Sequence, residues 1–576
     1  MSVQPRYLAA ASVMLIFVLV SCAMAKYSGP RGSKKKGGLI IKAAIWGPSQ
    51  EEANAAARRV ENSPAVQSFL NGVRYRLLSL DYLAESKSKS ERPPTRFRLV
   101  FYDYTNDRAI VAEADFAGRE SITVREEYSD PLPNDEEFNE ALAILRGDSR
   151  YSNDLASGAM KAYQPMPPTT ILDGTVERLL NVGLRGAGTQ NEIVGVSIKR
   201  GEAVRYEGNA PPQSRSVEGS CGPSSAGQTT TSNGTAGQAT LTVIDQTSMT
   251  TLWEMLVIRP SASSGTRKSG IEIRDVKYKG KSVLKRGHVP VLNVQYNPST
   301  CGPYRDWQWQ EDMFNAPDAG ATDLAPGIRL LAAGQVATTV LETGSDTGNF
   351  RGVAIYVQNT QYGPEAVLVS EMQAGWYRYL MEWRFAADGT IRPRYAFGTT
   401  NNSCVCDVHN HHAYWRFDFD VVQPNNKVFQ VERGRKFLQP LTTELTRQRN
   451  IGTNRSLLIQ NSSGNEAYEL VPGRLDGPAD AFAVSDFWVL RYKEVIGGTA
   501  LQNEIDDGFN QTTSANAFIQ INPFINGESI VGQDVVVWYG GHFIHSDGAN
   551  LLDPNRSPEI LSGEHVIGPD LRPVRW

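Results

Sequence analysis

Short stretches in which apolar and polar residues alternate dominate the chain from about residue 241 onward. Such alternation places successive side chains on opposite faces and is typical of β-strands with one buried face. The runs 376–385 and 404–421 also contain many aromatic and β-branched residues, which favour strands. Gly, Pro and Asn separate such runs, and long helical periods are few. We therefore predict that residues 241–576 form a large antiparallel β-sandwich.

The preceding part of the chain mixes helical and strand patterns. An Ala-rich helix is predicted over 47–74, with Ser49 as its cap and acids following at once. A second helix is predicted over 134–146, with Asn134 as its cap and acids in its first turns. The predicted strands of this part are 96–104, 109–115, 121–127, 176–184 and 192–198.

This mixture predicts two small α+β domains before the sandwich. We place the first at 26–130 and the second at 131–207. Residues 208–240 are rich in Gly, Ser and Thr and are predicted to be a linker to the sandwich domain at 241–576.

Residues 1–25 have the features of a signal peptide: a basic start, a short apolar core and an Ala-x-Ala sequence ending at Ala25. The apolar core is short for a membrane span. Leu-Val-Ser-Cys, ending at Cys22, leaves a bacterial lipoprotein signal open, whereas several Asn-x-Ser/Thr acceptors favour eukaryotic secretion. We therefore predict a secreted, extracellular protein without a stable membrane span.

Charge and cysteine content narrow the function further. The net charge of −4 over 576 residues argues against a nucleic-acid-binding protein, which would carry a basic surface. Removal of the signal peptide leaves four cysteines, and an oxidising compartment permits disulfides among them, with the pairing open. These cysteines are Cys221, Cys301, Cys404 and Cys406.

A His-x-His pair is the first candidate for chemistry. His409 and His411 share one face of the strand predicted over 404–421, so two imidazoles can reach one point. A third histidine from a distant strand would complete a three-nitrogen site with an open position, which suits copper or zinc better than calcium or magnesium. The alternative is that His409 and His411 bind no metal and are hydrogen-bonded polar residues at the end of a strand.

The surroundings of this pair form an ordered series of motifs over roughly 246–550 that resembles the copper amine oxidases. In that family a tyrosine in a short motif becomes topaquinone, and a His-x-His copper pair follows. The third copper histidine of the family lies seven residues after a Trp in an Asp-x-Val-Val-Trp strand; here that Trp is Trp538 and the histidine is His545, while His542 is off register. The matching residues of the tyrosine and histidine motifs are Tyr377, Tyr379, Glu382, Trp383, Phe385, Asp388, Gly389, Ile391, His409, His411, Arg416, Asp418 and Asp420.

The resemblance implies that His409, His411 and His545 bind copper and that Tyr377 is the precursor of topaquinone. It also implies a homodimer that oxidises a small primary amine with O2 to an aldehyde, ammonia and H2O2. Carboxylates and carbonyls at family positions imply a second ion, best matched by calcium. Its ligands would be Asp418, Phe419, Asp420, Asp534 and Val535, whereas the alternative is that the acids merely face solvent.

The catalytic base and the surroundings of the cofactor depart from the family pattern. Asp312 is our candidate for the base, with Asn315 or Asp318 at the base position under other alignments. Lys285 falls on a family tyrosine that contacts the quinone, and it either hydrogen-bonds the cofactor, pairs with a carboxylate or cross-links to Tyr377.

Two further departures lie on either side of Tyr377, where Trp376 and Arg378 replace an Asn and an acid. The sequence therefore predicts a divergent copper- and quinone-dependent primary-amine oxidase. The alternative is a catalytically silent, metal-binding extracellular structural or interaction protein on the same scaffold.

Overall fold

The structure is a computed structural model of the whole chain. It describes residues 38–83, 93–127, 131–163, 169–172, 176–186, 191–205, 237–265, 267–297, 304–343, 347–399, 408–435, 437–474, 476–477, 485–492, 521, 524–545 and 565–576. The predicted signal peptide, most of the predicted linker and all four cysteines of the mature chain lie outside these residues.

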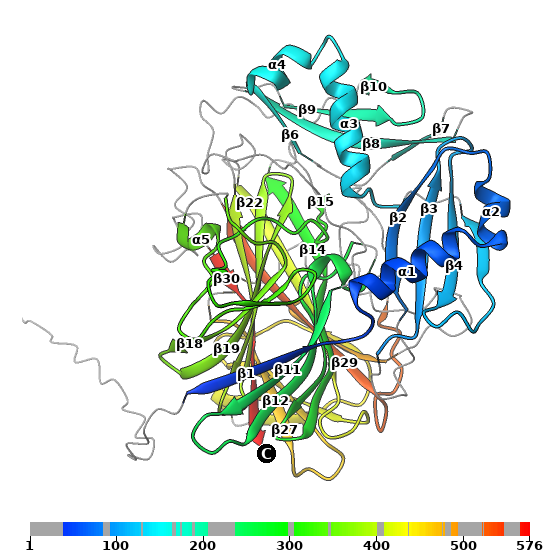
Figure 1. The fold of residues 1–576 in the computed structure, drawn as a ribbon. Helices are drawn as coiled ribbons and strands as arrows, with labels where there is room; N and C mark the ends of the chain where they lie inside the picture. The colour runs from blue at the N-terminus through cyan, green and yellow to red at the C-terminus, as the bar shows by residue number, and fades with distance from the viewer. Residues whose placement is uncertain are drawn as a thin grey trace, which may run out of the picture.

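Two large β-sheets form the body of the molecule, as the alternation from residue 241 onward predicts (Figure 1). The β22 sheet has ten strands in its described part. They are β1 (Leu39–Ile45), β11 (Gln238–Asp245), β12 (Thr251–Ile258), β13 (Glu272–Tyr278), β14 (Lys281–Asn297), β15 (Tyr304–Arg305), β22 (Val408–Phe419), β29 (Val535–His545), β28 (Phe487–Arg491) and β25 (Leu445–Arg447).

The β20 sheet has twelve strands in its described part, and only the pair β17–β18 is parallel among the described pairings. The twelve strands of the β20 sheet are β16 (Thr322–Ala325), β17 (Ile328–Leu330), β18 (Val353–Thr360), β19 (Gly363–Ala374), β20 (Tyr377–Ala386), β21 (Ile391–Thr399), β30 (His565–Ile567), β31 (Asp570–Arg575), β27 (Ala467–Val471), β26 (Arg455–Gln460), β23 (Lys427–Glu432) and β24 (Phe437–Pro440). The predicted mainly β fold with a large antiparallel sandwich is therefore confirmed.

The two sheets pack face to face through the residues that alternation turns inward. Trp415 and Phe417 of β22 share one buried core with Tyr379 and Trp383 of β20. The rings of Trp383 and Phe417 meet edge to face with centroids 6.3 Å apart. Large aromatic side chains of this kind bury much apolar area, so they hold the two sheets in a fixed alignment.

Two small units precede the sandwich, and they lie next to each other beside it in Figure 1. In the first, α1 (Gln50–Glu61) and α2 (Pro64–Leu70) cover a four-stranded sheet. In the second, α3 (Asp135–Gly147) and α4 (Ser152–Ser157) accompany a five-stranded sheet. Their strands are β2 (Tyr75–Tyr82), β3 (Arg96–Asp103), β4 (Arg108–Asp115) and β5 (Thr123–Glu127), then β6 (Met160–Tyr163), β7 (Thr169–Leu172), β8 (Val176–Gly186), β9 (Asn191–Ser197) and β10 (Glu202–Arg205).

The structure differs from two local predictions about this part of the chain. The helix predicted over 47–74 is divided, because Ser63 caps a new helix with Pro64 at its first position. The segment β1, which the sequence places in the first small domain, instead pairs with β11 and extends the β22 sheet. The predicted caps Ser49 and Asn134 both accept backbone hydrogen bonds as expected.

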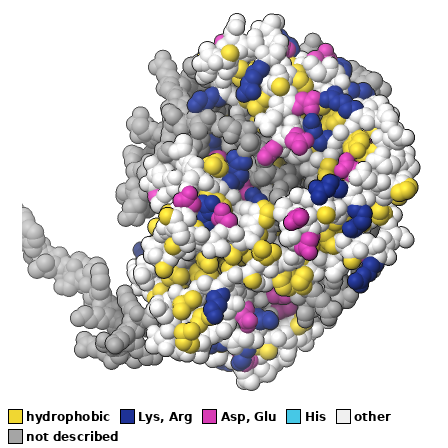
Figure 2. Space-filling view, in the orientation of Figure 1, with side chains coloured by type: hydrophobic (Ala, Val, Ile, Leu, Met, Phe, Trp, Pro, Cys, Tyr) yellow, Lys and Arg dark blue, Asp and Glu magenta, His cyan; other side chains and the backbone are white. Residues whose placement is uncertain are grey.

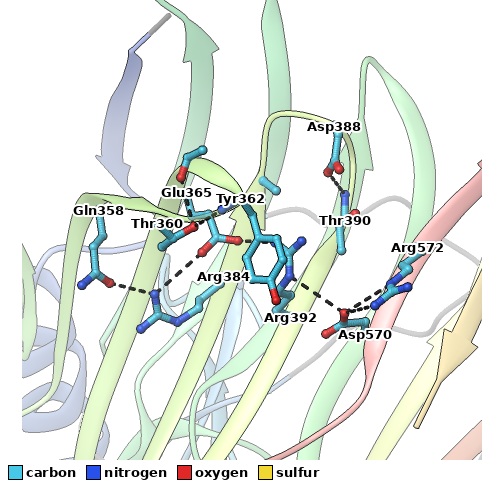
Figure 3. A network of polar contacts seen from close by, with 12 residues as sticks. Gln358, Thr360, Tyr362, Glu365, Arg384, Asp388, Thr390, Arg392, Asp570 and Arg572 are labelled. Carbon is cyan, nitrogen blue, oxygen red and sulfur yellow. Dashed lines mark hydrogen bonds and ion pairs between the residues drawn. The ribbon is translucent and has the colours of Figure 1, made fainter. Parts of the chain in front are cut away.

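The outer face of the β20 sheet carries cross-strand ion pairs (Figure 3). Arg392 of β21 pairs with the buried carboxylate of Glu365 on β19, and its guanidinium lies 4.2 Å from the ring centroid of Tyr362. Arg384 of β20 donates to Gln358 of β18 at 2.7 Å. These contacts tie neighbouring strands together on the face opposite to the core.

The distribution of charged side chains on the surface agrees with the near-neutral net charge. Figure 2 shows basic and acidic side chains interspersed on the face it presents. Among the described residues no helix is long and apolar enough to cross a membrane.

Candidate metal and tyrosine site

Three rings meet between the two sheets at one end of the sandwich. His409 and His411 are fully buried on β22, and their ring centroids lie 4.9 Å apart. Tyr377 enters from the facing sheet at the start of β20, with its ring centroid 5.6 Å from that of His409 and 4.9 Å from that of His411. The predicted histidine pair and the predicted cofactor tyrosine are therefore brought together from segments about thirty residues apart in sequence.

The backbone register gives His545 the position that a third ligand needs. In the antiparallel pairing of β22 with β29, His545 lies directly opposite His409. Directly opposed residues of antiparallel strands share one face of the sheet. The side chain of His545 lies outside the described part of the structure, so its role as a ligand stays a prediction.

His542 takes part in a separate contact on the reverse face of the β22 sheet. It lies opposite His412, and the two Nδ1 atoms are 2.9 Å apart. Its Nε2 lies 3.0 Å from the carbonyl oxygen of Ser485. Burial lowers the pKa of His412 to about 3, so that ring is neutral at ordinary pH. His542 is thus engaged away from His409 and His411, which agrees with its being off register.

Tyr379 forms the next layer behind Tyr377. Both lie on the inner face of β20, and their rings stack with centroids 5.5 Å apart and an angle of 24° between the ring planes. The Tyr379 hydroxyl donates a hydrogen bond to Oδ2 of Asp306, a nearly buried carboxyl that follows β15. Burial raises the pKa of Asp306 to about 7, and the Tyr379 hydrogen bond and the charge of Arg267 oppose that rise.

Sequence reasoning missed Asp306. It lies a few residues before the three base candidates Asp312, Asn315 and Asp318, but no motif singles it out, and its burial depends on the packing of the two sheets. Its neighbour Gln308 accepts a hydrogen bond from Tyr395 of β21 at 2.9 Å. The segment that contains both residues therefore follows the inner face of the β20 sheet.

The prediction that Asp312 is the base at Tyr377 is wrong, because the Asp312 carboxylate pairs with Arg378. Oδ2 of Asp312 lies 2.6 Å from Nε of Arg378, whose side chain is almost fully buried. Consecutive residues of a strand face opposite sides, so Arg378 draws Asp312 to the face of β20 that is turned away from the Tyr377 ring. The other two candidates, Asn315 and Asp318, are exposed.

The prediction that Lys285 lies beside Tyr377 is also wrong. On β14, Leu284 is opposite Phe419 and Tyr296 is opposite His409, so Lys285 lies at the far end of the strand. At about 3.3 Å per residue, the eleven steps from 285 to 296 span roughly 35 Å. Nζ of Lys285 instead lies 2.7 Å from Oδ1 of Asp275, which is the ion-pair alternative.

The predicted acidic ligands form one cluster. Oxygen atoms of Asp418, Asp420 and Asp534 all lie within 4.8 Å of one another. The chain neighbours Phe419 and Val535 lie at the adjoining ends of β22 and β29. Asp418 lies nine steps along β22 from His409, roughly 30 Å, so the two sites are remote from each other.

The chemistry of each donor set fits the ion predicted for it. Imidazole nitrogens suit copper, and the cluster of carboxylates suits a hard cation such as Ca²⁺. The buried, aromatic surroundings of His409 and His411 also restrict water, since Phe397 packs against the His411 ring at 4.6 Å between centroids.

No protein-family model and no curated protein matches the sequence. Solved structures of amine oxidases match almost the whole chain. A copper-containing benzylamine oxidase from Hansenula polymorpha matches with a TM-score of 0.56 and 13% identity, over 93% of this chain and 97% of that one.

Two further solved structures give the same result. An Aspergillus nidulans amine oxidase matches with a TM-score of 0.52 and 14% identity, over 94% of this chain and 91% of that one. A Pichia pastoris lysyl oxidase matches with a TM-score of 0.51 and 13% identity, over 92% and 90% of the two chains. The fold is thus similar to that of copper amine oxidases. At this identity the likeness shows the fold alone, so the activity must be argued from the site.

Proposed function

We propose that this protein is a divergent, copper- and quinone-dependent primary-amine oxidase. The observation that carries the proposal is the meeting of Tyr377 with His409 and His411 between the two sheets. A tyrosine held against a buried histidine pair is placed for metal-dependent modification, whereas a purely structural core needs no imidazoles there. The similar fold of three amine oxidases supports the same conclusion.

In this proposal His409, His411 and His545 hold copper, and Tyr377 is the precursor of topaquinone. Bound copper and the quinone would supply the oxidation of a small primary amine by O2, with release of aldehyde, ammonia and H2O2. The protein contributes orientation and exclusion of water: Tyr379 stacks behind Tyr377, and Phe397 covers His411. Both effects preorganise the site before substrate enters.

We further propose a structural Ca²⁺ at Asp418, Asp420 and Asp534, with the carbonyls of Phe419 and Val535 as added ligands. The clustering of the three carboxylates supports it. Extracellular location and a homodimer are part of the same proposal, and they rest on the N-terminal sequence pattern and on the family resemblance.

The test is to load the full chain with copper in air and to look for the quinone by redox staining and by the mass of the peptide that contains Tyr377. We expect modification in the wild type and none in Tyr377→Phe. The matched control is Tyr539→Phe, which removes the hydroxyl of another buried tyrosine of the same core, on β29, and should leave Tyr377 convertible.

H2O2 release from a panel of primary amines then measures the activity itself. Copper bound at full stoichiometry beside an unmodified Tyr377 would contradict the proposal and would support a catalytically silent metal-binding protein.

A further inference from the structure

The strand β26 has an Asn-x-Ser sequence at each end, and the two asparagines differ in exposure. Asn454 precedes the strand and is exposed, whereas Asn461 follows it and is 4% exposed. In a secreted protein an Asn-x-Ser sequence accepts an N-linked oligosaccharide, which is bulky and polar and therefore needs a site at the surface. The other Asn-x-Ser/Thr sequences of the chain lie outside the described residues. Exposure of the side-chain amide thus decides which end of β26 carries a sugar in the folded protein.

Asn454 is the last residue of a tight turn. Its backbone N–H donates to the carbonyl oxygen of Ile451 at 3.3 Å, and Oδ1 of Asn450 accepts the N–H of Thr453 at 3.0 Å. Its φ of 49° lies in the left-handed region, which asparagine tolerates better than most residues. In the described part of the chain no hydrogen bond engages the side-chain amide of Asn454. A sugar on Nδ2 therefore displaces no contact of this turn.

Asn461 uses both atoms of its amide to hold the turn between β26 and β27. Its Nδ2, the atom that would carry a sugar, donates a hydrogen bond to the Glu466 carboxylate. Its Oδ1 accepts the backbone N–H groups of Gly464, Asn465 and Glu466 at 2.9, 3.1 and 3.3 Å. An oligosaccharide on this nearly buried amide would displace Glu466 and open the turn. The same Asn-x-Ser sequence is therefore closed to modification at this end of the strand.

The hydroxyl of Ser456 sets the order of events at the first sequence. Ser456 is 2% exposed, and its Oγ donates to Oε1 of Glu469 on β27 at 2.5 Å. An enzyme that recognises this hydroxyl together with Asn454 reaches it only before β26 pairs with β27. Transfer is thus expected on the unfolded chain. Folding then selects, because a sugar at Asn454 stays outside, whereas a chain with a sugar at Asn461 does not form the turn.

We propose that Asn454 carries an N-linked oligosaccharide in the secreted protein and that Asn461 does not. The donor is a lipid-linked oligosaccharide diphosphate. Nδ2 of Asn454 loses a proton and forms a bond to the anomeric carbon of the first sugar. The bond from that carbon to the diphosphate breaks, and the lipid diphosphate leaves with the electron pair, so nothing is oxidised or reduced. The inference rests on the extracellular location within the proposed function and is independent of copper and of Tyr377.

The test is a map of the sites in full-length protein that eukaryotic cells secrete into the medium. A glycosidase that cleaves the bond between sugar and asparagine, used in heavy-oxygen water, converts each modified asparagine into a mass-labelled aspartate. We expect the label at Asn454 in most molecules and no label at Asn461.

Two variants each remove one Asn-x-Ser sequence without touching a buried contact. Asn454→Gln replaces an exposed side chain, and Ser463→Ala removes an exposed hydroxyl that the second sequence needs. The intact mass of Asn454→Gln should fall by one oligosaccharide, whereas Ser463→Ala should keep the full set of the wild type. After enzymatic removal of all sugars, both variants should melt at the temperature of the wild type treated in the same way.

A third variant tests the structural role given to Asn461. Asn461→Ala should leave the oligosaccharide mass unchanged and should lower the melting temperature, because three backbone N–H groups lose their acceptor. If this variant does not reach the medium, the map of the wild type still decides the question.

The negative results are distinguishable. Secreted wild-type protein with an unlabelled Asn454, or with a labelled Asn461, would overturn the inference. Copper loading of the same sample tests the chemistry of the proposed function separately, since modification of Tyr377 depends on neither asparagine. Folded protein that stays inside the cells without any oligosaccharide would overturn both the extracellular location and this inference.

Discussion

Two adjacent histidines of one strand allow a sharp test of the copper site. His411 and His412 are both fully buried on β22, but they lie on opposite faces of the β22 sheet. We predict that His411→Ala abolishes specific copper binding and that His412→Ala does not. The two substitutions remove the same side chain from neighbouring positions, so general damage to the strand cannot explain a difference between them.

The expected magnitudes follow from the two environments. Only the folded state presents the copper site. Copper at a concentration a hundredfold above its dissociation constant therefore stabilises the folded state by about 2.7 kcal/mol, which raises the apparent melting temperature by several degrees. His411→Ala should lose this shift. His412→Ala leaves buried His542 without its 2.9 Å partner and should cost about 1–3 kcal/mol without metal, while the copper-induced shift persists.

Differential scanning calorimetry with and without Cu²⁺, together with copper content by elemental analysis, provides the assay. The reasoning would be refuted by equal copper loss in both variants. It would also be refuted by His411→Ala protein that keeps the thermal shift of the wild type. His545→Ala and His542→Ala form a second pair on β29 with the same expected contrast.

Three further predictions follow from the other sites. If the proposed ion binds at Asp418, Asp420 and Asp534, a chelator that spares copper should lower the melting temperature of the wild type but not of Asp534→Asn. Elemental analysis that shows no second metal would contradict this prediction. Burial raises the pKa of Asp306 from 3.8 to about 7, so its contribution to stability is present below about pH 4 and lost as pH rises to 7. At pH 8 the free energy of unfolding of Asp306→Asn, measured by denaturant unfolding, should therefore exceed that of the wild type by up to about 4 kcal/mol, and at pH 5 the difference should be smaller. An equal difference at both pH values would refute this. Lys285→Gln should leave Tyr377 modification unchanged, because its ammonium pairs with Asp275, and a linked peptide pair containing Lys285 and Tyr377 would contradict the structure.

The sequence by itself determined the local features of this protein. Period-two alternation predicts the strands of the sandwich, and a spacing of two residues puts His409 and His411 on one face wherever the strand lies. Local hydrogen bonding likewise predicts the caps at Ser49 and Asn134, since a cap depends only on the next three residues. The spacing from Trp538 distinguishes His545 from His542 because three residues along a strand change the face.

Only the tertiary structure decided which of these faces meet. Tyr377 reaches the histidine pair because the β20 and β22 sheets align across a shared aromatic core, and no local pattern encodes that alignment. Counting along 304–318 fails to place a base, since in this irregular segment side-chain direction is set by partners such as Arg378 and Tyr379 from another strand. Lys285 shows the same limit: residue matching places it beside the cofactor, whereas the register of β14 against β22 carries it to the far end of the sheet.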